Sequence, residues 1–150
     1  MGCALSALGR HADARGVWEK VLPLLADEPR CGRLDLERSS ILLNIGNSYS
    51  REGNHDKAKE FYASAEKLGQ EHLDIENGNK VDGLAIVQEA MRVRSFALKR
   101  AGKEDEAKNM LRKVLELQVQ KDEAEKNQKA TEEKMQKEEA EKLQIEGPKQ

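Results

Sequence analysis

Three segments of the chain share one pattern of glycine, alanine and apolar residues, and this repetition constrains the fold more than any other feature. In each segment a glycine is followed five residues later by an alanine, and the alanine is followed four residues later by a larger apolar residue. A unit that recurs along a chain indicates a protein built from stacked repeats. The repeated positions are Gly9, Ala14 and Trp18; Gly53, Ala58 and Tyr62; and Gly102, Ala107 and Leu111.

This spacing predicts a tight turn that leads into the second helix of a hairpin. Glycine at the turn adopts a left-handed conformation without steric cost, so it ends one helix and lets the chain reverse. The alanine is small because two antiparallel helices cross closely there, and the larger residue one turn later fills the space between them. An aspartate near the start of each second helix stabilises the helix dipole. These are Asp13, Asp56 and Asp105.

The residues before the middle glycine have the period of a helix that packs through one face. Leu42, Ile45, Gly46 and Tyr49 recur at intervals of three or four, which places them on one side. We expect Gly46 to face Ala58 across the hairpin, since both contact surfaces are then small.

The stretch from Leu42 to Ala65 resembles the tetratricopeptide repeat (TPR) signature, with Leu42 where tryptophan is usual. This resemblance implies an all-α fold, a right-handed TPR-like superhelical stack of antiparallel helical hairpins. The glycines lie 44 and 49 residues apart (53 minus 9, and 102 minus 53), whereas the usual period is about 34 residues. No repeat has the usual closing proline, so the pattern resembles the long-helix subclass, similar to kinesin light chains and LGN-type repeats.

We expect TPR-like repeats over residues 1–117 and a charged helical tail over 118–150, frayed or disordered at its end. The first repeat is incomplete, so we expect either a fragment of a larger solenoid or a first helix that packs on a partner. The repeats are predicted at 1–32, 33–78 and 79–117, and the helices at about 1–8, 11–28, 34–52, 55–74, 80–101 and 104–140.

The tail is strongly charged, with seven lysines and nine acidic residues. Several acids stand four residues before a base, a spacing that stabilises a helix by about 0.2–0.5 kcal/mol per pair. One interpretation is a solvated helix that continues the third repeat, and the other is a strut or docking helix within an assembly. The expected pairs are Asp122–Lys126, Glu125–Lys129, Glu133–Lys137 and Glu138–Lys142.

The resemblance also implies a ligand-binding groove on the concave side, formed by the first helix of each hairpin. Asparagine is a weak helix former, so two asparagines on one helix face suggest amides that bind a peptide backbone. Basic residues nearby favour an acidic or carboxylate-bearing peptide; the alternative is that all these positions are ordinary solvated ones. The predicted groove residues are Asn44, Asn47, Arg51, Arg92, Phe96, Lys99 and Arg100, and the other implied positions are Ser40, Leu43, Ser50, Glu89 and Val93.

The first residues fit the pattern for N-myristoylation at Gly2, with Cys3 as a palmitoylation candidate. The repeat register explains the same residues, because Gly2 stands where the middle repeat has Gly46. The residues from Met1 to Ser6 are consistent with both interpretations.

Other classes of function find little support. A net charge of -2 gives no basis for nucleic-acid binding through bulk charge. Cys3 and Cys31 fit no metal-ligand spacing, and the three histidines lie far apart, so we expect no metal, no cofactor and no catalysis. With charged residues at 36% and aromatic residues at 3%, the composition favours solvated helices over a β-sandwich. No apolar run is long enough to span a membrane.

We therefore predict a non-catalytic adaptor or scaffold that binds proteins, within a hetero-oligomeric complex. One alternative is a structural subunit built permanently into a large complex, such as a ciliary docking or organellar assembly. Another is a co-chaperone of the Hsp70/Hsp90 type, for which the basic clamp is incomplete. We expect an intracellular protein, cytoplasmic first, with a cytoskeletal or ciliary location as the alternative.

Overall fold

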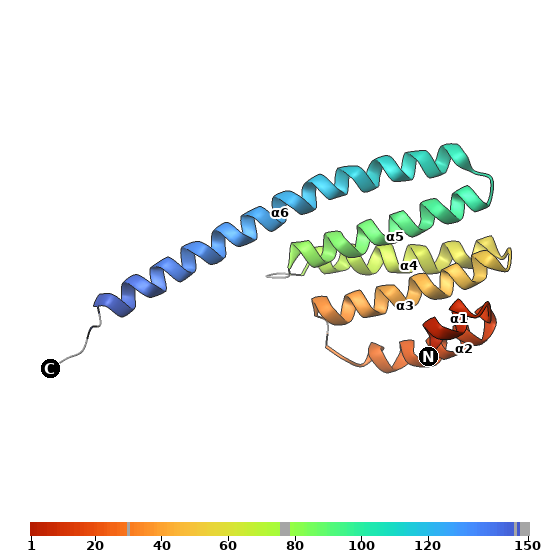
Figure 1. Cartoon of the computed structure of the whole chain (residues 1–150), viewed down its shortest axis with the longest axis horizontal. Coiled ribbons are helices and arrows are strands. Elements are labelled where there is room, and N and C mark those ends of the chain that lie inside the picture. The colour runs from red at the N-terminus through yellow and green to blue at the C-terminus, as the bar shows by residue number, and fades with distance from the viewer. Residues whose placement is uncertain (30, 76–78, 146, 148–150) are drawn as a thin grey trace.

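The computed structural model describes residues 1–29, 31–75, 79–145 and 147, and all regular structure within these residues is α-helical. Successive helices run in opposite directions, and the two outer ones, α1 and α6, differ greatly in length (Figure 1). The helices are α1 (Gly2–Ala7), α2 (His11–Ala26), α3 (Gly32–Arg51), α4 (His55–Leu73), α5 (Lys80–Arg100) and α6 (Glu104–Ile145).

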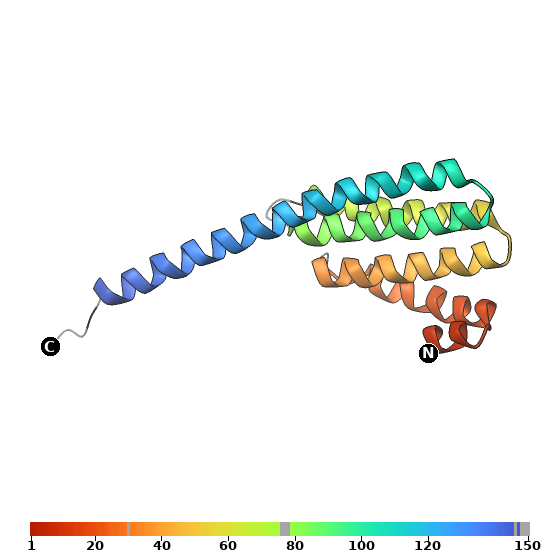
Figure 2. The same cartoon turned by 45° about the horizontal axis from the view of Figure 1, so that its top comes forward.

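The helices form antiparallel hairpins that stack on one another. Each helix contacts the next along the chain, and α3 also contacts α5, so that the first helices of two hairpins lie side by side (Figure 2). This is an all-α, TPR-like helical stack, as predicted. The predicted helix ends agree with the structure to within a few residues, except that α6 continues to Ile145. Helix α2 contains Pro23 within its last turns.

The three repeated glycines end helices in the way the sequence predicts. Gly9, Gly53 and Gly102 have φ angles of 76°, 82° and 77°, in the left-handed region that L side chains rarely adopt. At the middle turn the Asn54 amide donates to the Tyr49 carbonyl at 2.9 Å. The Asn54 side chain then caps α4, since its Oδ1 accepts from the backbone amide of Lys57. Each turn therefore ends one helix and begins the next within four residues.

The predicted small contact surfaces meet in the core of the middle hairpin. A Cβ atom at Gly46 would lie 3.3 Å from the carbonyl oxygen of Ala58, which confirms that these residues face each other. Trp18 and Tyr62 are buried, as predicted. Leu111, expected in the same role, is 40% exposed, so that prediction was wrong. In the described chain no further helix follows α6 to cover it.

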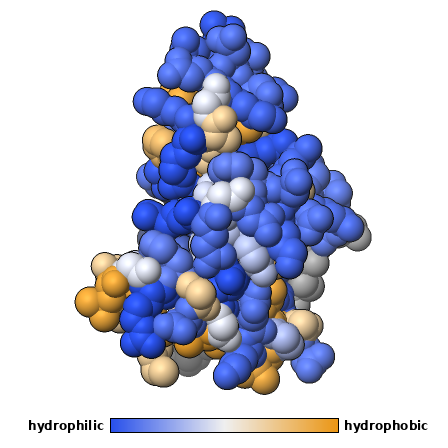
Figure 3. Space-filling model, turned by 90° about the vertical axis from the view of Figure 1, so that its right-hand side faces the viewer, coloured by the Kyte–Doolittle hydropathy of each residue, from blue (hydrophilic) through white to orange (hydrophobic). Residues whose placement is uncertain are grey.

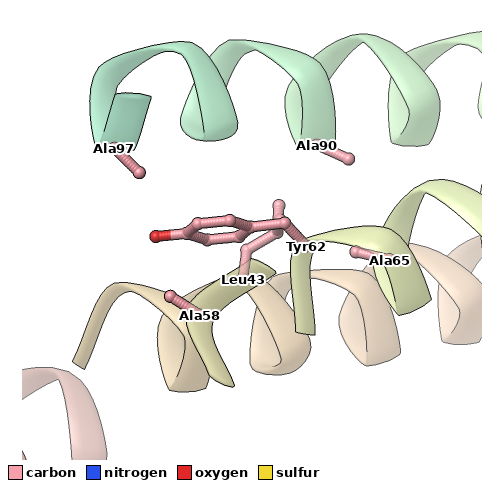
Figure 4. Close-up of a cluster of buried hydrophobic side chains, with 6 residues drawn as sticks. All are labelled: Leu43, Ala58, Tyr62, Ala65, Ala90 and Ala97. Carbon is pink, nitrogen blue, oxygen red and sulfur yellow. The ribbon is translucent and has the colours of Figure 1, made fainter. Parts of the chain in front are cut away.

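The largest part of the core lies where α3, α4 and α5 meet. Figure 4 shows the Tyr62 ring between Leu43 of α3 and the alanines of α5. Alanine on α5 lets that helix approach the ring closely, and the ring fills the space left between three helices. The residues in this cluster are Leu43, Ala58, Tyr62, Ala65, Ala90 and Ala97.

Polar contacts join the first hairpin to the second. The guanidinium of Arg15 lies 4.1 Å from the ring centroid of Tyr49, and its Nη1 donates to Glu52 Oε2 at 2.6 Å. The Ser48 hydroxyl donates to the His11 carbonyl at 2.9 Å. These contacts orient α2 along α3, beside a smaller apolar cluster that contains Trp18.

The second half of α6 leaves the stack and extends alone, as Figures 1 and 2 both show. Every residue from Lys126 to Ile145 is exposed. The four ion pairs predicted for this region do not form, and among the described residues from 118 onward the pairs are Lys121–Glu125 and Lys134–Glu138, both at 3.9 Å. Exposed side chains on one helix exchange such partners at almost no energetic cost. The described helices include none that is both long and apolar enough to cross a membrane.

Candidate protein-binding face

Two adjacent helices carry all seven residues predicted for the groove. Asn44, Asn47 and Arg51 recur at intervals of three and four on α3, so they share one side of it. The α5 residues do the same at positions 92, 96, 99 and 100. We call this surface the α3–α5 face, defined by Asn44, Asn47, Arg51, Arg92, Phe96, Lys99 and Arg100.

A hydrogen-bonded bridge joins the two halves of the face. Asn47 Oδ1 accepts from the Tyr62 hydroxyl at 2.9 Å and from Arg100 Nη2 at 3.3 Å. The same Arg100 nitrogen also donates to Ser50 Oγ at 3.3 Å. The amide oxygen of Asn47 therefore already accepts hydrogen bonds within the protein. It links the buried Tyr62 to Arg100 at the surface.

Phe96 is the main apolar feature of the face, and its side chain is 49% exposed. Arg92 lies one turn before it, with its guanidinium 5.7 Å from the ring centroid. Glu89 accepts two hydrogen bonds from Arg92, at 2.6 and 2.7 Å, and these bonds raise the pKa of the guanidinium. The charge of Arg92 is therefore neutralised by Glu89, and this ion pair lies beside the ring of Phe96.

The net positive charge of the face comes from its other three cations. Among the ion pairs formed by described residues, none includes Arg51, Lys99 or Arg100. The oxygens that Arg100 contacts, on Asn47 and Ser50, are uncharged. One end of the face thus combines uncompensated positive charge with an exposed phenyl ring nearby.

Two other positions that the resemblance implied as ligand contacts do not reach the surface. Leu43 belongs to the core around Tyr62, and Ser50 is buried beneath Arg100. A ligand on this face would therefore not touch Leu43, because its side chain points between helices.

The N-terminal residues pack in the way that the repeat register predicts. Gly2 is buried, and a Cβ atom there would lie 2.7 Å from Cε2 of Trp18. Cys3 is exposed with a free thiol. The packing against Trp18 gives Gly2 a structural reason to be glycine, independent of lipidation.

A buried polar cluster that was not predicted from the sequence lies at the other end of the middle hairpin. His72 Nδ1 lies 3.0 Å from Asp35 Oδ2, and Arg38 donates to Asp35 Oδ1 at 2.7 Å. Arg38 also donates to the carbonyl oxygens of Leu25 and Glu28, the second at 2.7 Å, so it caps the end of α2. The cluster ties together the ends of three helices. Because Asp35 and His72 are almost fully buried, we assign it a structural role.

A signal for this cluster exists in the helical periodicity. Asp35 and Arg38 continue the buried stripe of α3 backward from Leu42, and His72 continues the stripe Ala58, Tyr62, Ala65 and Gly69 of α4. Polar residues on two buried stripes at the same level predict a buried pair. Elsewhere in the described chain, no three histidine, cysteine or acidic residues are placed to hold a metal ion.

Comparison with protein families agrees with this architecture. Residues 39–72, which cover most of α3 and nearly all of α4, match the family model of the tetratricopeptide repeat. This match covers the middle hairpin and supports a tetratricopeptide repeat there. No curated protein and no solved structure matches the chain. The repeat is a protein-interaction fold that is generally non-catalytic, so it indicates an adaptor role.

Proposed function

We propose that the TPR stack binds an acidic peptide segment, with at least one large apolar side chain, on the α3–α5 face. The observation that carries this proposal is the pairing of exposed Phe96 with three cations that lack an acidic partner among the described residues. Carboxylates on a ligand would form charge-assisted hydrogen bonds with Arg51, Lys99 and Arg100. An apolar ligand side chain would cover the ring of Phe96.

Arg100 is held in position for a ligand by hydrogen bonds within the protein. Its contacts with Asn47 and Ser50 hold the guanidinium over the junction between α3 and α5. A side chain that is already held in place loses less rotamer freedom when a ligand binds. Asn47 therefore supports the site by positioning Arg100, and Asn44 remains the amide that is open to a peptide backbone.

The test is a selection from a random peptide display library against the whole chain. We expect enrichment of peptides that combine Asp or Glu with Leu or Phe. Lys99→Glu and Phe96→Ala should each weaken binding of an enriched peptide by about tenfold, since an exposed charge contact and a ring contact each contribute on the order of 1 kcal/mol. Lys20→Glu, an equal change of charge at an exposed position on α2, serves as the control.

Enrichment without acidic residues, or binding that Lys99→Glu and Phe96→Ala leave unchanged, would reject the proposed site. These single substitutions test the site more directly than Asn47→Ala does, because Asn47→Ala also removes the hydrogen-bond acceptor of Tyr62. A loss of binding in Asn47→Ala would therefore mix a change in the site with a change in the core.

A second candidate function is a subunit built permanently into a larger assembly. It is favoured by exposed apolar side chains on the first hairpin, where Leu8 and Leu24 are 75% and 71% exposed. Figure 3 shows a hydrophobic patch toward the bottom of the stack, where α1 and α2 lie. Thermal unfolding of the purified chain separates the two: a soluble chain that melts cooperatively supports the adaptor, and aggregation supports the built-in subunit.

A further inference from the structure

Three apolar side chains form an exposed row on the first half of α6. Leu111, Leu115 and Val119 are 40%, 68% and 58% exposed, and their spacing of four places them on one side of the helix. The side packed on α5 includes Ala107 and Val114. At 3.6 residues per turn the exposed row lies about a quarter turn away from that packed side. Figure 3 shows hydrophobic patches in this upper part of the molecule, where α6 begins.

Charged residues extend the row at both ends in a particular order. Read from the N-terminal end, the row has an acid, a base, three apolar residues, an acid and a base. None of the four charged residues forms an ion pair with another described residue, although Gln118 donates a hydrogen bond to Asp122. We call this row the α6 stripe, and its residues are Glu104, Lys108, Leu111, Leu115, Val119, Asp122 and Lys126.

The order of charges makes the α6 stripe complementary to its own reverse. If a second copy runs antiparallel with Leu115 at the centre, Glu104 of one copy meets Lys126 of the other. In the same register Lys108 meets Asp122, and Leu111 meets Val119. A two-fold axis repeats each contact, so the pair would form four ion pairs around an apolar centre. A parallel pair would instead place each charge opposite itself.

We propose that α6 mediates an antiparallel homodimer, centred on Leu115. The α6 stripe lies beside the contact with α5 and does not overlap the α3–α5 face, so the dimer is independent of the proposed function. Each dimer would present two binding faces. A protein with two linked sites binds a partner with repeated motifs far more tightly than one site does.

The dimension of the stripe sets the expected affinity. From Glu104 to Lys126 a helix extends about 33 Å, and with a contact about 10 Å wide the two copies would cover roughly 700 Å² in total. Stable complexes bury about 1,200–2,000 Å², so the dimer belongs with weak and transient interfaces. We therefore expect dissociation constants in the range of about 10–500 µM.

Sedimentation equilibrium of the whole chain over that range of concentration tests the proposal. The wild-type chain should pass from monomer to dimer. Lys108→Glu and Asp122→Lys should each weaken dimerisation by about tenfold or more, because each reverses two contacts of the symmetric pair. The double variant Lys108→Glu/Asp122→Lys restores complementary charges and should return the dimer. Lys134→Glu, on the exposed end of the same helix, should have no effect.

The register is tested by disulfide formation in a background with Cys3→Ser and Cys31→Ser. Leu115→Cys should form a disulfide-linked dimer under mild oxidation, since the two-fold axis brings this position opposite itself. Lys134→Cys should not. A chain that stays monomeric up to about 500 µM overturns the proposal. Single reversals without effect, or a double variant that fails to restore the dimer, would assign the stripe to a different partner.

Discussion

A Cβ atom at Gly46 would lie 2.6 Å from Cε1 of Tyr62, closer than two carbon atoms can approach without displacement. The ring is buried between α3, α4 and α5, so it cannot move outward freely. This contact explains why the first helix of the middle hairpin needs glycine at that position, and it makes Gly46 a direct probe of how closely the helices pack.

We expect Gly46→Ala to lower the free energy of unfolding by about 1–2 kcal/mol, because the cost of overpacking exceeds the gain in helix propensity. Gly16→Ala on α2 is the matched control, since no atom outside the neighbouring backbone of its own helix lies within 4 Å of the added Cβ. That variant should gain about 0.5–1 kcal/mol from helix propensity alone. Urea denaturation followed by circular dichroism measures both, and two shifts in the stabilising direction would contradict the close contact.

The buried cluster at the other end of the hairpin gives a second prediction. Asp35→Asn removes the negative charge between Arg38 and His72 and leaves a buried guanidinium without it. Loss of one partner from a buried ion pair costs about 3–5 kcal/mol. Glu37→Gln on the same helix is the control, because its partner Arg33 is largely exposed, and it should change stability by less than about 0.5 kcal/mol. Equal denaturation midpoints for the two variants would refute the structural role of the cluster.

The hairpins could be predicted from sequence because their signals are local. A glycine that ends a helix and an alanine five residues later act within a few residues of each other, so the three turns and the facing pair Gly46 and Ala58 were correctly predicted. The pairing of His72 with Asp35 joins residues 37 positions apart. It depends on how far the two helices continue past the repeat signature, which the signature itself does not contain.

The α3–α5 face was predicted only in outline, because its electrostatics depend on contacts across helices. The sequence placed the basic residues on one side, but it did not show that Glu89 neutralises Arg92 or that Asn47 accepts from Tyr62 and Arg100. The prediction that Leu111 is buried was wrong for a related reason. The repeat pattern marks it as a core position, and only the arrangement of neighbouring helices shows that it stays exposed.

Tyr62 gives a prediction for the pH dependence of stability. Burial raises the pKa of its hydroxyl, an effect that Arg100 partly opposes. In the unfolded chain this tyrosine ionises near its ordinary pKa of about 10, before the folded protein does. Its contribution to stability is therefore complete below about pH 10 and is lost as pH rises through the folded pKa.

Comparison with Tyr62→Phe isolates this effect, because the two proteins share every other titrating group. At pH 7 the wild type should be more stable by about 1 kcal/mol, owing to the hydrogen bond to Asn47. Above about pH 10 this advantage should shrink as the pH rises toward the folded pKa of Tyr62, and it should then be lost. Denaturant midpoints measured across the range provide the readout, and an advantage that grows with pH would show that the sign is wrong.

The exposed half of α6 should be the least stable part of the folded chain. All residues from Lys126 to Ile145 are exposed, and the second half of α6 extends away from the stack. An isolated helix of about 20 residues is only marginally stable in water. Amides there should exchange hydrogen for deuterium orders of magnitude faster than those of α4, because their opening requires almost no free energy. Measurement at a few micromolar by mass spectrometry keeps the chain monomeric.

A pair of substitutions on the same helix extends this test. Ala130→Gly should reduce helical content without a change in the unfolding midpoint, since Ala130 is exposed and stabilises nothing outside its own helix. Ala107→Gly should lower the free energy of unfolding by about 1–2 kcal/mol, because Ala107 is buried near the start of α6, where this helix packs against α5. If residues 126–145 were instead as protected as α4, or if both alanines mattered equally, that half of α6 would have to be packed against another surface.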